Sequence, residues 1–280
     1  MTELRKRMIE DMQLRGFSEK TRKSYVDAVR GLARFYNRSP DRLSEQEIRE
    51  FFLHLINEKR AARSTVTIYL CGIKFFYEKT LGRDWPVFDL IRPQKSFKLP
   101  VVLALEEVRQ LLSLVSNPVR QMALRMIYSC GFRLSEGLHL QVQHIDSKRM
   151  LVHVQSGKGG KDRYVPLPEK TLEYLRAYWS LCRPAPWLFP AKHGNQPLSD
   201  TSLQKTFKAV VRQSGIGKDV SIHSLRHSYA THLLENGIDL RVIQQILGHK
   251  SPQTTCIYTH LTRKTVDRLQ ATVNYLMNDL

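Results

Sequence analysis

Cysteine is scarce in this sequence, and its spacing fits neither a metal site nor a disulfide framework. Only four cysteines occur among 280 residues, and no two of them form a CxxC pair. Such residues are typical of reduced structural thiols in a cytosolic protein. The chain also lacks any run of about 18 apolar residues, and residues 1–12 lack the apolar core of a signal peptide. These absences predict a soluble protein of the cytoplasm.

Acidic residues are also few relative to basic ones. The sequence has 44 Lys and Arg against 26 Asp and Glu, which gives a formal net charge of +18. Residues 1–98 carry 21 basic and 13 acidic residues, and the remainder carries 23 and 13, so the excess is not confined to a tail. A basic surface of this extent suits a long anionic partner such as duplex DNA. Charge alone leaves open a basic enzyme that does not bind nucleic acid.

The N-terminal part of the sequence has the apolar periodicity of helices. Four helices are predicted, over residues 3–15, 18–37, a segment after a capping box at 44–47, and 64–81. In the last helix the pattern predicts that Ile68, Cys71, Phe75 and Phe76 point inward. Some basic side chains fall outside the apolar stripes and are free to meet phosphates, although a solvated helix face is the commoner role. These candidate DNA-binding residues are Arg5, Arg22, Lys23 and Arg63.

A proline-rich segment over residues 83–100 has no helical period and is interpreted as a linker. The predicted organisation is an N-terminal helical DNA-binding domain over residues 1–90, a linker over 91–102 and a second domain over 103–280.

The second domain combines helices with one hairpin. Strands predicted at 150–155 and 162–167 flank a glycine-rich turn. Helices are predicted near 104–115, from Asn117, and at 169–181, 200–214, 223–236, 239–247 and 252–258. The expected fold is mostly α with a small antiparallel β-sheet in the C-terminal domain.

The helix predicted over residues 223–236 carries an arginine on its apolar side. At 100° per residue, His223, Arg226 and His227 fall within the apolar arc, while serines and a threonine form a polar face on the other side. An inward arginine needs an anionic partner, because burial of an unpaired guanidinium is costly. Backbone N–H groups at the start of the helix also favour a phosphate. An internal salt bridge of Arg226 to a carboxylate is the alternative.

Other segments contribute groups suited to phosphate chemistry. Arg133 begins a short helix, where Glu136 could hold its guanidinium and leave the fork facing outward. Lys158 and Lys161 lie in the glycine-rich turn of the hairpin. Further on, a helix ends at Gly248, a histidine follows, and Ser-Pro opens a helix that carries a tyrosine. A single tyrosine in a helix is more often a packing residue than a nucleophile.

Together these segments resemble the tyrosine recombinase, or phage integrase, family. GFRLSE, GKGGKDR, HSLRHSYATHLLENG and LGHKSPQTTCIYTHL look like its motifs, in the same order and spacing. The resemblance covers essentially the whole chain, is strongest over residues 120–262, and is closest to the short Xer-type and integron-type enzymes. No arm-binding domain is expected before Met1, and the insertion of integron integrases near 215–222 is lacking. A simple duplex core site is therefore expected as substrate.

The resemblance implies a site-specific recombinase that clamps DNA between two domains, of which the N-terminal one is SAM-like. Tyr258 would attack the scissile phosphate and form a covalent 3′-phosphotyrosine. The phosphate would be clamped by two arginines, with one histidine donating a hydrogen bond and another assisting proton transfer. A lysine would protonate the leaving 5′ oxygen. The implied catalytic residues are Arg133, Lys158, His223, Arg226, His249 and Tyr258, with Glu136 as support to Arg133.

Further expectations concern cofactors and DNA contacts. No cofactor is implied, because the phosphotyrosine retains the bond energy and religation needs neither ATP nor a metal. Lys161 is a competitor of Lys158 as general acid, and both Lys161 and Arg163 are candidate DNA contacts. His227 is interpreted as a core histidine rather than a catalytic one.

Assembly is implied by the number of strands exchanged. One tyrosine cuts one strand, so recombination of four strands calls for a dimer on each site and a tetramer in the synapse. The tail over 262–280 has apolar residues at helical spacing, and the resemblance implies that it docks on a neighbouring subunit; packing on its own domain is the alternative. Accessory DNA-bending proteins and association with the nucleoid are further expectations, with no membrane partner.

Several alternatives remain open. The chain could be an inactive DNA-binding protein of the same fold, or a relaxing topoisomerase with the same nucleophile. A zinc site of His223, His227 and His232 is disfavoured by their angular spread, and a metal-dependent nuclease by the lack of clustered carboxylates. GKGGK lacks the spacing of a phosphate-binding P-loop. The sequence does not distinguish integration from excision or resolution. It also does not distinguish a housekeeping enzyme from one carried by a mobile element.

Overall fold

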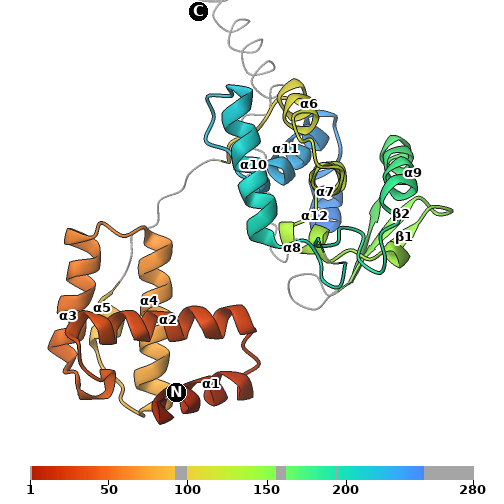
Figure 1. The fold of residues 1–280 in the computed structure, drawn as a ribbon. Coiled ribbons are helices and arrows are strands. Elements are labelled where there is room, and N and C mark those ends of the chain that lie inside the picture. The colour runs from red at the N-terminus through yellow and green to blue at the C-terminus, as the bar shows by residue number, and fades with distance from the viewer. Residues whose placement is uncertain (1, 92–99, 156–161, 193, 249–280) are drawn as a thin grey trace, which may run out of the picture. The chain divides into compact units, whose positions relative to one another are not determined.

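The computed structural model describes residues 2–91, 100–155, 162–192 and 194–248. The chain divides into two compact units, Met1–Phe97 and Lys98–Leu280 (Figure 1). Much of the predicted linker lies outside the described residues. Among the described residues, no helix is both long enough and apolar enough to cross a membrane.

The first unit is built from helices that follow the predicted order closely. Ser18 caps the second helix by accepting a hydrogen bond from the backbone N–H of Thr21, and the predicted capping box of Ser44 and Glu47 is present. Two helices continue directly into a π-helical turn. The elements are α1 (Glu3–Leu14), α2 (Glu19–Tyr36), a 3-10 turn (Pro40–Arg42), α3 (Glu45–Leu53) with a π turn (His54–Glu58), α4 (Arg63–Phe75) with a π turn (Phe76–Thr80), and α5 (Val87–Leu90).

The inward face of α4 differs from the predicted one. Phe75 and Phe76 are buried as expected, but Ile68 is 43% exposed and Cys71 is also exposed. The reason is the close approach of α2 at Gly72, where an added Cβ would lie 3.0 Å from the Cα of Tyr25. This contact turns a different side of α4 toward the core.

The second unit is mostly helical with a small sheet, which confirms the predicted fold class. In Figure 1 the sheet lies beside α9. The helices are α6 (Leu105–Ser113), α7 (Pro118–Ser129), α8 (Leu134–Leu138), a 3-10 turn (Val142–His144), α9 (Glu169–Cys182), α10 (Asp200–Ser214), α11 (Ile222–Glu235) and α12 (Leu240–Leu247). The strands are β1 (Ile145–Asp146), β2 (Leu151–Val154) and β3 (Arg163–Pro166).

The sheet has the order β1-β2-β3 and is antiparallel throughout. The predicted hairpin is β2 and β3, with Val152 opposite Val165 and Val154 opposite Arg163. Side chains on one face of the hairpin are buried, including those of Val152, Val154 and Val165. The sequence did not predict β1, because two residues are too few to show the alternation of a strand.

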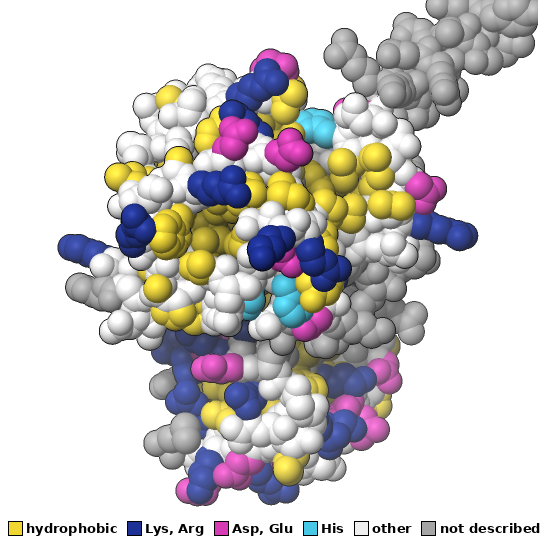
Figure 2. Space-filling view, turned by 90° about the vertical axis from the view of Figure 1, so that its right-hand side faces the viewer, with side chains coloured by type: hydrophobic (Ala, Val, Ile, Leu, Met, Phe, Trp, Pro, Cys, Tyr) yellow, Lys and Arg dark blue, Asp and Glu magenta, His cyan; other side chains and the backbone are white. Residues whose placement is uncertain are grey.

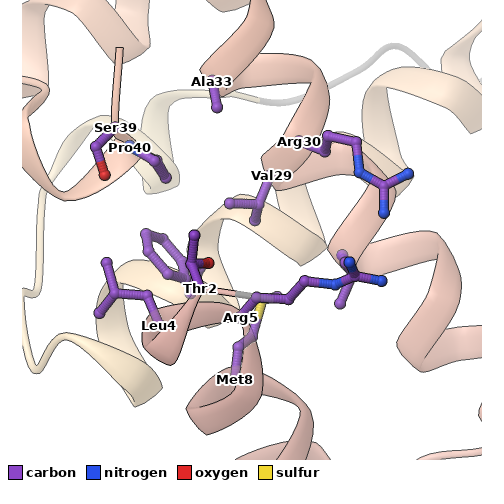
Figure 3. A pocket seen from close by; sticks show the side chains of 11 residues that line it. Thr2, Leu4, Arg5, Met8, Val29, Arg30, Ala33, Ser39 and Pro40 are labelled. Carbon is purple, nitrogen blue, oxygen red and sulfur yellow. The ribbon is translucent and has the colours of Figure 1, made fainter.

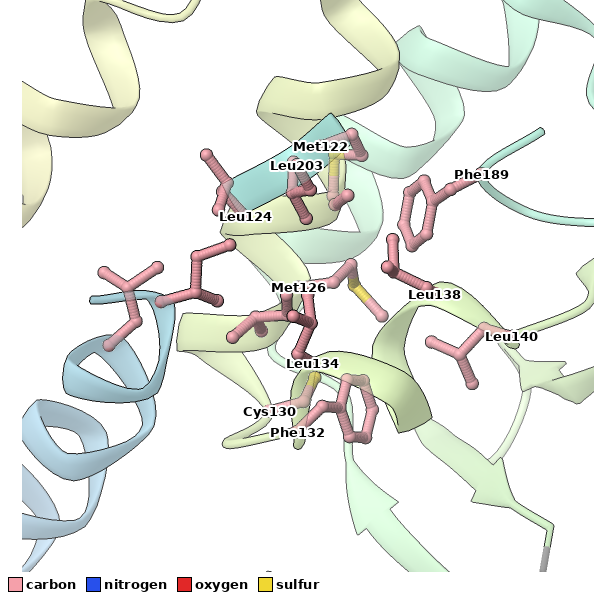
Figure 4. Packing of buried hydrophobic residues seen from close by; sticks show 14 of the residues in the cluster. Met122, Leu124, Met126, Cys130, Phe132, Leu134, Leu138, Leu140, Phe189 and Leu203 are labelled. Atoms are coloured by element: carbon pink, nitrogen blue, oxygen red, sulfur yellow. The ribbon is translucent and has the colours of Figure 1, made fainter. Parts of the chain in front are cut away.

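A continuous apolar core holds the second unit together. It brings α7, α8 and α10 against the segment around Phe189, as Figure 4 shows for Met122, Leu138, Phe189 and Leu203. Phe132, which precedes the candidate Arg133, is 1% exposed in this core. Burial of Phe132 therefore fixes the backbone from which the Arg133 side chain extends.

Helix α11 is buried on more sides than its sequence pattern predicts. The face expected to be polar includes Ser224, Ser228 and Thr231, and all three are buried. Ser228 Oγ accepts a hydrogen bond from the Leu103 backbone N–H at 2.8 Å and donates one to the Ser224 carbonyl at 2.7 Å. Hydroxyl groups that are paired in this way can be buried at little cost, which explains the difference.

Candidate active site around Glu136

One carboxylate, Glu136, gathers three arginines in the second unit. Glu136 lies in the first turn of α8, and its side chain is only 6% exposed. Its Oε1 accepts from Arg133 Nη1 at 2.5 Å and its Oε2 from the Arg133 backbone N–H at 2.9 Å. Arg163 from β3 donates to both oxygens, at 3.1 and 2.8 Å. Arg226 Nη1 from α11 lies 3.7 Å from Oε2.

The charge of this cluster is strongly positive. Burial alone would disfavour the ionised carboxylate, but hydrogen bonds from Arg163 and Arg133 outweigh it and lower the pKa of Glu136 to about 2. Glu136 is therefore ionised at neutral pH and offsets only one of three guanidinium charges. We name the set Arg133, Glu136, Arg163 and Arg226 the arginine cluster.

The arginine cluster also holds the end of α12. Three successive backbone carbonyls accept from three different arginines: Ile246 O from Arg163 Nε at 2.8 Å, Leu247 O from Arg226 Nη2 at 2.6 Å, and Gly248 O from Arg133 Nη2 at 2.9 Å. The last carbonyls of a helix have no partner within the helix and carry partial negative charge, so cations are favoured there. The cluster thereby joins α8, β3 and α11 to the point where α12 ends.

Arg226 is buried, as its place on the apolar side of α11 predicts, with a relative exposure of 4%. The internal salt bridge to a carboxylate that the sequence left open as the alternative is present, to Glu136, but shorter contacts are made to backbone carbonyls. Nη1 donates to Gly131 O at 2.6 Å and Nη2 to Leu247 O, while the carboxylate of Glu136 is more distant. Backbone carbonyls leave no signature in a sequence, so this mode of pairing could not be predicted from side-chain types.

Two histidines of α11 have different environments. His223 is exposed in the first turn. His227 is partly buried, and burial, followed by the nearby charges of His223 and Arg226, lowers the pKa of His227 to about 4. The imidazole of His227 is thus neutral at pH 7. His232 lies with its Nδ1 2.9 Å from the Tyr128 hydroxyl, and the described residues contain no group of three His, Cys, Asp or Glu that could hold a metal ion.

Several predicted site residues lie outside the described residues. They are Lys158, Lys161, His249, Tyr258 and the tail over 262–280. Their places in the sequence relate them to described elements: the two lysines fall between β2 and β3, and His249 follows Gly248 directly.

The structure uses Arg163 in a way that sequence reasoning missed. It was expected to contact DNA, but three of its nitrogens donate within the protein, to Glu136 and to Ile246 O. This pairing favours an internal role over the predicted DNA contact. A signal was present in the strand: Val165 and Leu167 are buried at alternate positions, and Arg163 shares their side of the alternation.

In the first unit, three of the four predicted DNA-binding residues come together. Arg5, Arg22 and Lys23 line a groove of about 380 Å³ between α1 and α2, together with Arg30. Arg63 is exposed at the start of α4 and is not part of this lining. Figure 2 shows basic side chains distributed over the face in view, interspersed with acidic ones.

A larger cavity adjoins this groove. It has a volume of about 680 Å³, is lined mainly by apolar side chains, and has Arg5 and Arg30 at one side (Figure 3). Met8 and Val29 from α1 and α2 form part of its wall.

Comparisons with known proteins identify the family. Residues 102–265 match the phage integrase family, and residues 4–87 match the phage integrase N-terminal SAM-like domain. An integrase/recombinase of Sinorhizobium fredii is 42% identical over 267 residues, which cover 95% of this chain and 87% of that protein. The tyrosine recombinase XerD of Staphylococcus aureus is 35% identical over 246 residues, covering 82% of each chain.

A solved structure shares the fold. A lambda integrase dimer bound to a COC′ core site superposes with a TM-score of 0.75 at 18% identity, over 92% of this chain and 94% of the integrase. The chain belongs to the phage integrase family of tyrosine recombinases, which are site-specific DNA recombinases.

Proposed function

We propose that this chain cleaves and rejoins duplex DNA at a specific core site through a covalent intermediate on Tyr258. The observation that carries the proposal is the arginine cluster, in which one carboxylate holds guanidinium groups from α8, β3 and α11 and leaves a net charge of +2. Arg133 and Arg226 are assigned to the scissile phosphate. Bidentate guanidinium groups neutralise phosphoryl oxygens and can take the place of a metal ion at developing charge.

The reaction is an in-line displacement at phosphorus. The Tyr258 oxygen forms a bond to phosphorus and loses its proton with the assistance of His223. The bond from phosphorus to the 5′ oxygen breaks, and Lys158 supplies the proton that makes the free 5′-hydroxyl. His249 donates a hydrogen bond to the phosphate. Religation by another 5′-hydroxyl reverses these steps, so no ATP is consumed and no divalent metal is required.

Sequence adjacency supports the assignment of His249. It follows Gly248, whose carbonyl is held by Arg133, and Gly248 has the left-handed φ of 63° that ends α12. Because His249 is bonded directly to Gly248, the hydrogen bond between Gly248 and Arg133 supports a place for His249 near the arginine cluster. The assignment of Lys158 rather than Lys161 rests on its match to the family motif GKGGKDR.

The proposed substrate is duplex DNA bound by both domains, 1–90 and 103–280. Basic residues exceed acidic ones in both parts of the chain, and the groove of Arg5, Arg22 and Lys23 offers contacts to phosphates. The lambda integrase with the same fold is bound to a core site as a dimer. We assign a dimer to each site and a tetramer to the synapse, linked through 262–280, in a protein that works on cytoplasmic DNA of the nucleoid.

A nicked suicide substrate in the presence of EDTA tests the proposal. Loss of the short nicked fragment prevents religation, so the wild-type protein is expected to accumulate a denaturation-resistant protein–DNA adduct. Tyr258→Phe lacks the nucleophilic oxygen and is expected to form none while still binding the site. An adduct formed by the Phe variant would place the nucleophile elsewhere. Binding by the wild type without any adduct would favour the inactive DNA-binding protein.

A further inference from the structure

Arg163 occupies a position where a strand normally carries an apolar residue. It lies opposite Val154 on β2 and precedes the buried Val165 by two positions, so it shares the inward side of β3. Its side chain is 11% exposed. A charge at such a place is costly unless hydrogen bonds and an opposite charge compensate it.

The compensation comes from two elements at once. Nη1 and Nη2 of Arg163 each donate to one oxygen of Glu136, at 3.1 and 2.8 Å, and Nε donates to Ile246 O of α12 at 2.8 Å. A planar guanidinium is suited to such a fork, whereas a lysine ammonium could reach only part of it. Arg163 therefore determines both the plane of the Glu136 carboxylate and the position of the α12 terminus.

Gly248 provides an independent sign that this contact shapes the site. A Cβ added at Gly248 would lie 3.2 Å from both Cδ and Nη1 of Arg163. The arginine thus packs against the residue that ends α12, where an added Cβ would require Arg163 to shift by a few tenths of an ångström. The carbonyl oxygen of Gly248 also accepts a hydrogen bond from Arg133 Nη2.

We propose that Arg163 is a positioning residue of the active site, which acts on Arg133 and Arg226 through Glu136 and the end of α12 and does not itself contact DNA. The inference rests on the proposed function, in which Arg133 and Arg226 bind the phosphate. Arg163 occupies both oxygens of Glu136, and this limits how much of the carboxylate the other two arginines can take. Without Arg163, the carboxylate is free to turn toward them and to draw their donors away from a phosphate.

The expected consequence is a slower reaction with nearly unchanged binding. Supporting residues around a site typically affect activity by about 10-fold to 100-fold when removed, and the phosphate clamp matters most when charge develops in the transition state. Binding depends on many phosphate contacts along the duplex, so displacement of one guanidinium pair changes it little.

The test compares Arg163→Met, Arg163→Lys and the control Arg176→Met, an exposed arginine of α9. The single-turnover rate of adduct formation on a suicide substrate is measured at saturating DNA, along with the DNA Kd as a function of salt. Arg163→Met is expected to lower the rate by about 10-fold to 100-fold, with Kd and salt dependence close to wild type. Arg163→Lys is expected to recover part of the rate, and the control to match wild type.

The opposite pattern would overturn the proposal. An unchanged rate at saturating DNA, together with a salt slope reduced by about one, would make Arg163 a phosphate contact. If the wild type forms no adduct, the proposed function fails. If the wild type forms the adduct and Arg163→Met forms it at the same rate, only the positioning role of Arg163 fails. Circular dichroism shows whether each variant is folded, and if Arg163→Met is not, the rate and salt slope of Arg163→Lys decide.

A double-mutant cycle locates the path of the effect. Because Arg163 acts through Glu136, Arg163→Met is expected to slow adduct formation much less in a Glu136→Gln background than in the wild type. Rate effects that simply multiply in the double variant would mean that Arg163 acts independently of the carboxylate, and the path through Glu136 would be wrong.

Discussion

Arg226 and Gly131 are joined by a hydrogen bond of 2.6 Å from Nη1 to the carbonyl oxygen, although 95 positions separate them in the sequence. The bond ties α11 to the turn that precedes Arg133. Gly131 has a left-handed φ of 62°, and an added Cβ would lie 2.5 Å from the Tyr229 ring. The two arginines assigned to the phosphate are thus held by the same short segment, which makes their spacing a property of the backbone.

Gly248→Ala is expected to destabilise the second unit more than an equivalent change at another helix end. Gly248 and Gly215 both end helices with a left-handed φ, of 63° and 72°. Only Gly248 is crowded, because an added Cβ there meets Arg163, whereas at Gly215 nothing lies within 4 Å. Alanine at either position costs about 1 kcal/mol from its φ, and Gly248→Ala adds the displacement of Arg163. Free energies of unfolding from urea titrations of both variants measure the difference; equal losses would contradict it.

Glu136→Gln is expected to change the acid limb of the stability profile. The folded pKa of Glu136 is depressed from 4.5 to about 2, so the carboxylate contributes stability that is present above pH 4.5 and is lost as the pH falls toward 2. The contribution amounts to at most about 3 kcal/mol at neutral pH. The variant should be less stable at pH 7 and show a flatter dependence between pH 4.5 and 2.

Denaturation midpoints measured from pH 2 to 7 provide the check. Glu106→Gln, at a side chain that is 77% exposed on α6, serves as the control and should follow the wild-type profile. A Glu136→Gln profile parallel to wild type over the acid limb would show that the carboxylate is not held as described.

His227→Gln is expected to act in a separate pH window. The folded pKa of His227 is lowered from 6.5 to about 4, so the unfolded state takes up a proton first as the pH falls. Because of this residue, the free energy of unfolding decreases as the pH falls from 6.5 to 4. Replacement by the neutral glutamine removes that loss and flattens the profile in this window. Thermal melts of the variant and of His139→Gln, an exposed histidine, at pH 7, 5.5 and 4.5 test the expectation.

Deletion of residues 265–280 is expected to weaken cooperative DNA binding while leaving the fold of the isolated protein intact. The apolar residues of this tail recur at helical spacing, and the proposal places them on a neighbouring subunit. Gel-shift titrations on a full site and on a half site separate cooperativity from single-subunit affinity. Unchanged cooperativity on the full site would contradict the contact with a neighbouring subunit and favour packing of the tail on its own domain.

Much of the fold follows from local signals in the sequence. Turn residues and capping groups marked most helix ends, as at Ser18, Ser44 and Gly248, because these signals act over a few residues. Predictions failed where tertiary contacts decided the outcome. The close approach of α2 at Gly72 turned the face of α4, and hydrogen bonds of the Ser228 hydroxyl to backbone groups of Leu103 and Ser224 allowed Ser228 to be buried.

The candidate site could be predicted in its residue types but not in its connections. The pairing of Arg133 with Glu136 is confirmed, since three positions along a helix bring the two groups together. Arg163 and the carbonyls of α12 were missed as partners because their contacts span 21 to 115 positions, and backbone oxygens look alike in every sequence. Strand alternation at Val165 was the one local sign that Arg163 faces inward.

The way in which the arginines meet α12 affects which substitutions the site tolerates. All three guanidinium groups recognise main-chain oxygens of residues 246–248, so the side chains of Ile246 and Leu247 take no part in the polar contacts. Exchange of these two for other apolar residues that keep the helix is limited only by packing. The arginines and Gly248 cannot be exchanged in this way. Apolar substitutions should therefore be tolerated at Ile246 and Leu247, whereas substitutions at Gly248 should not.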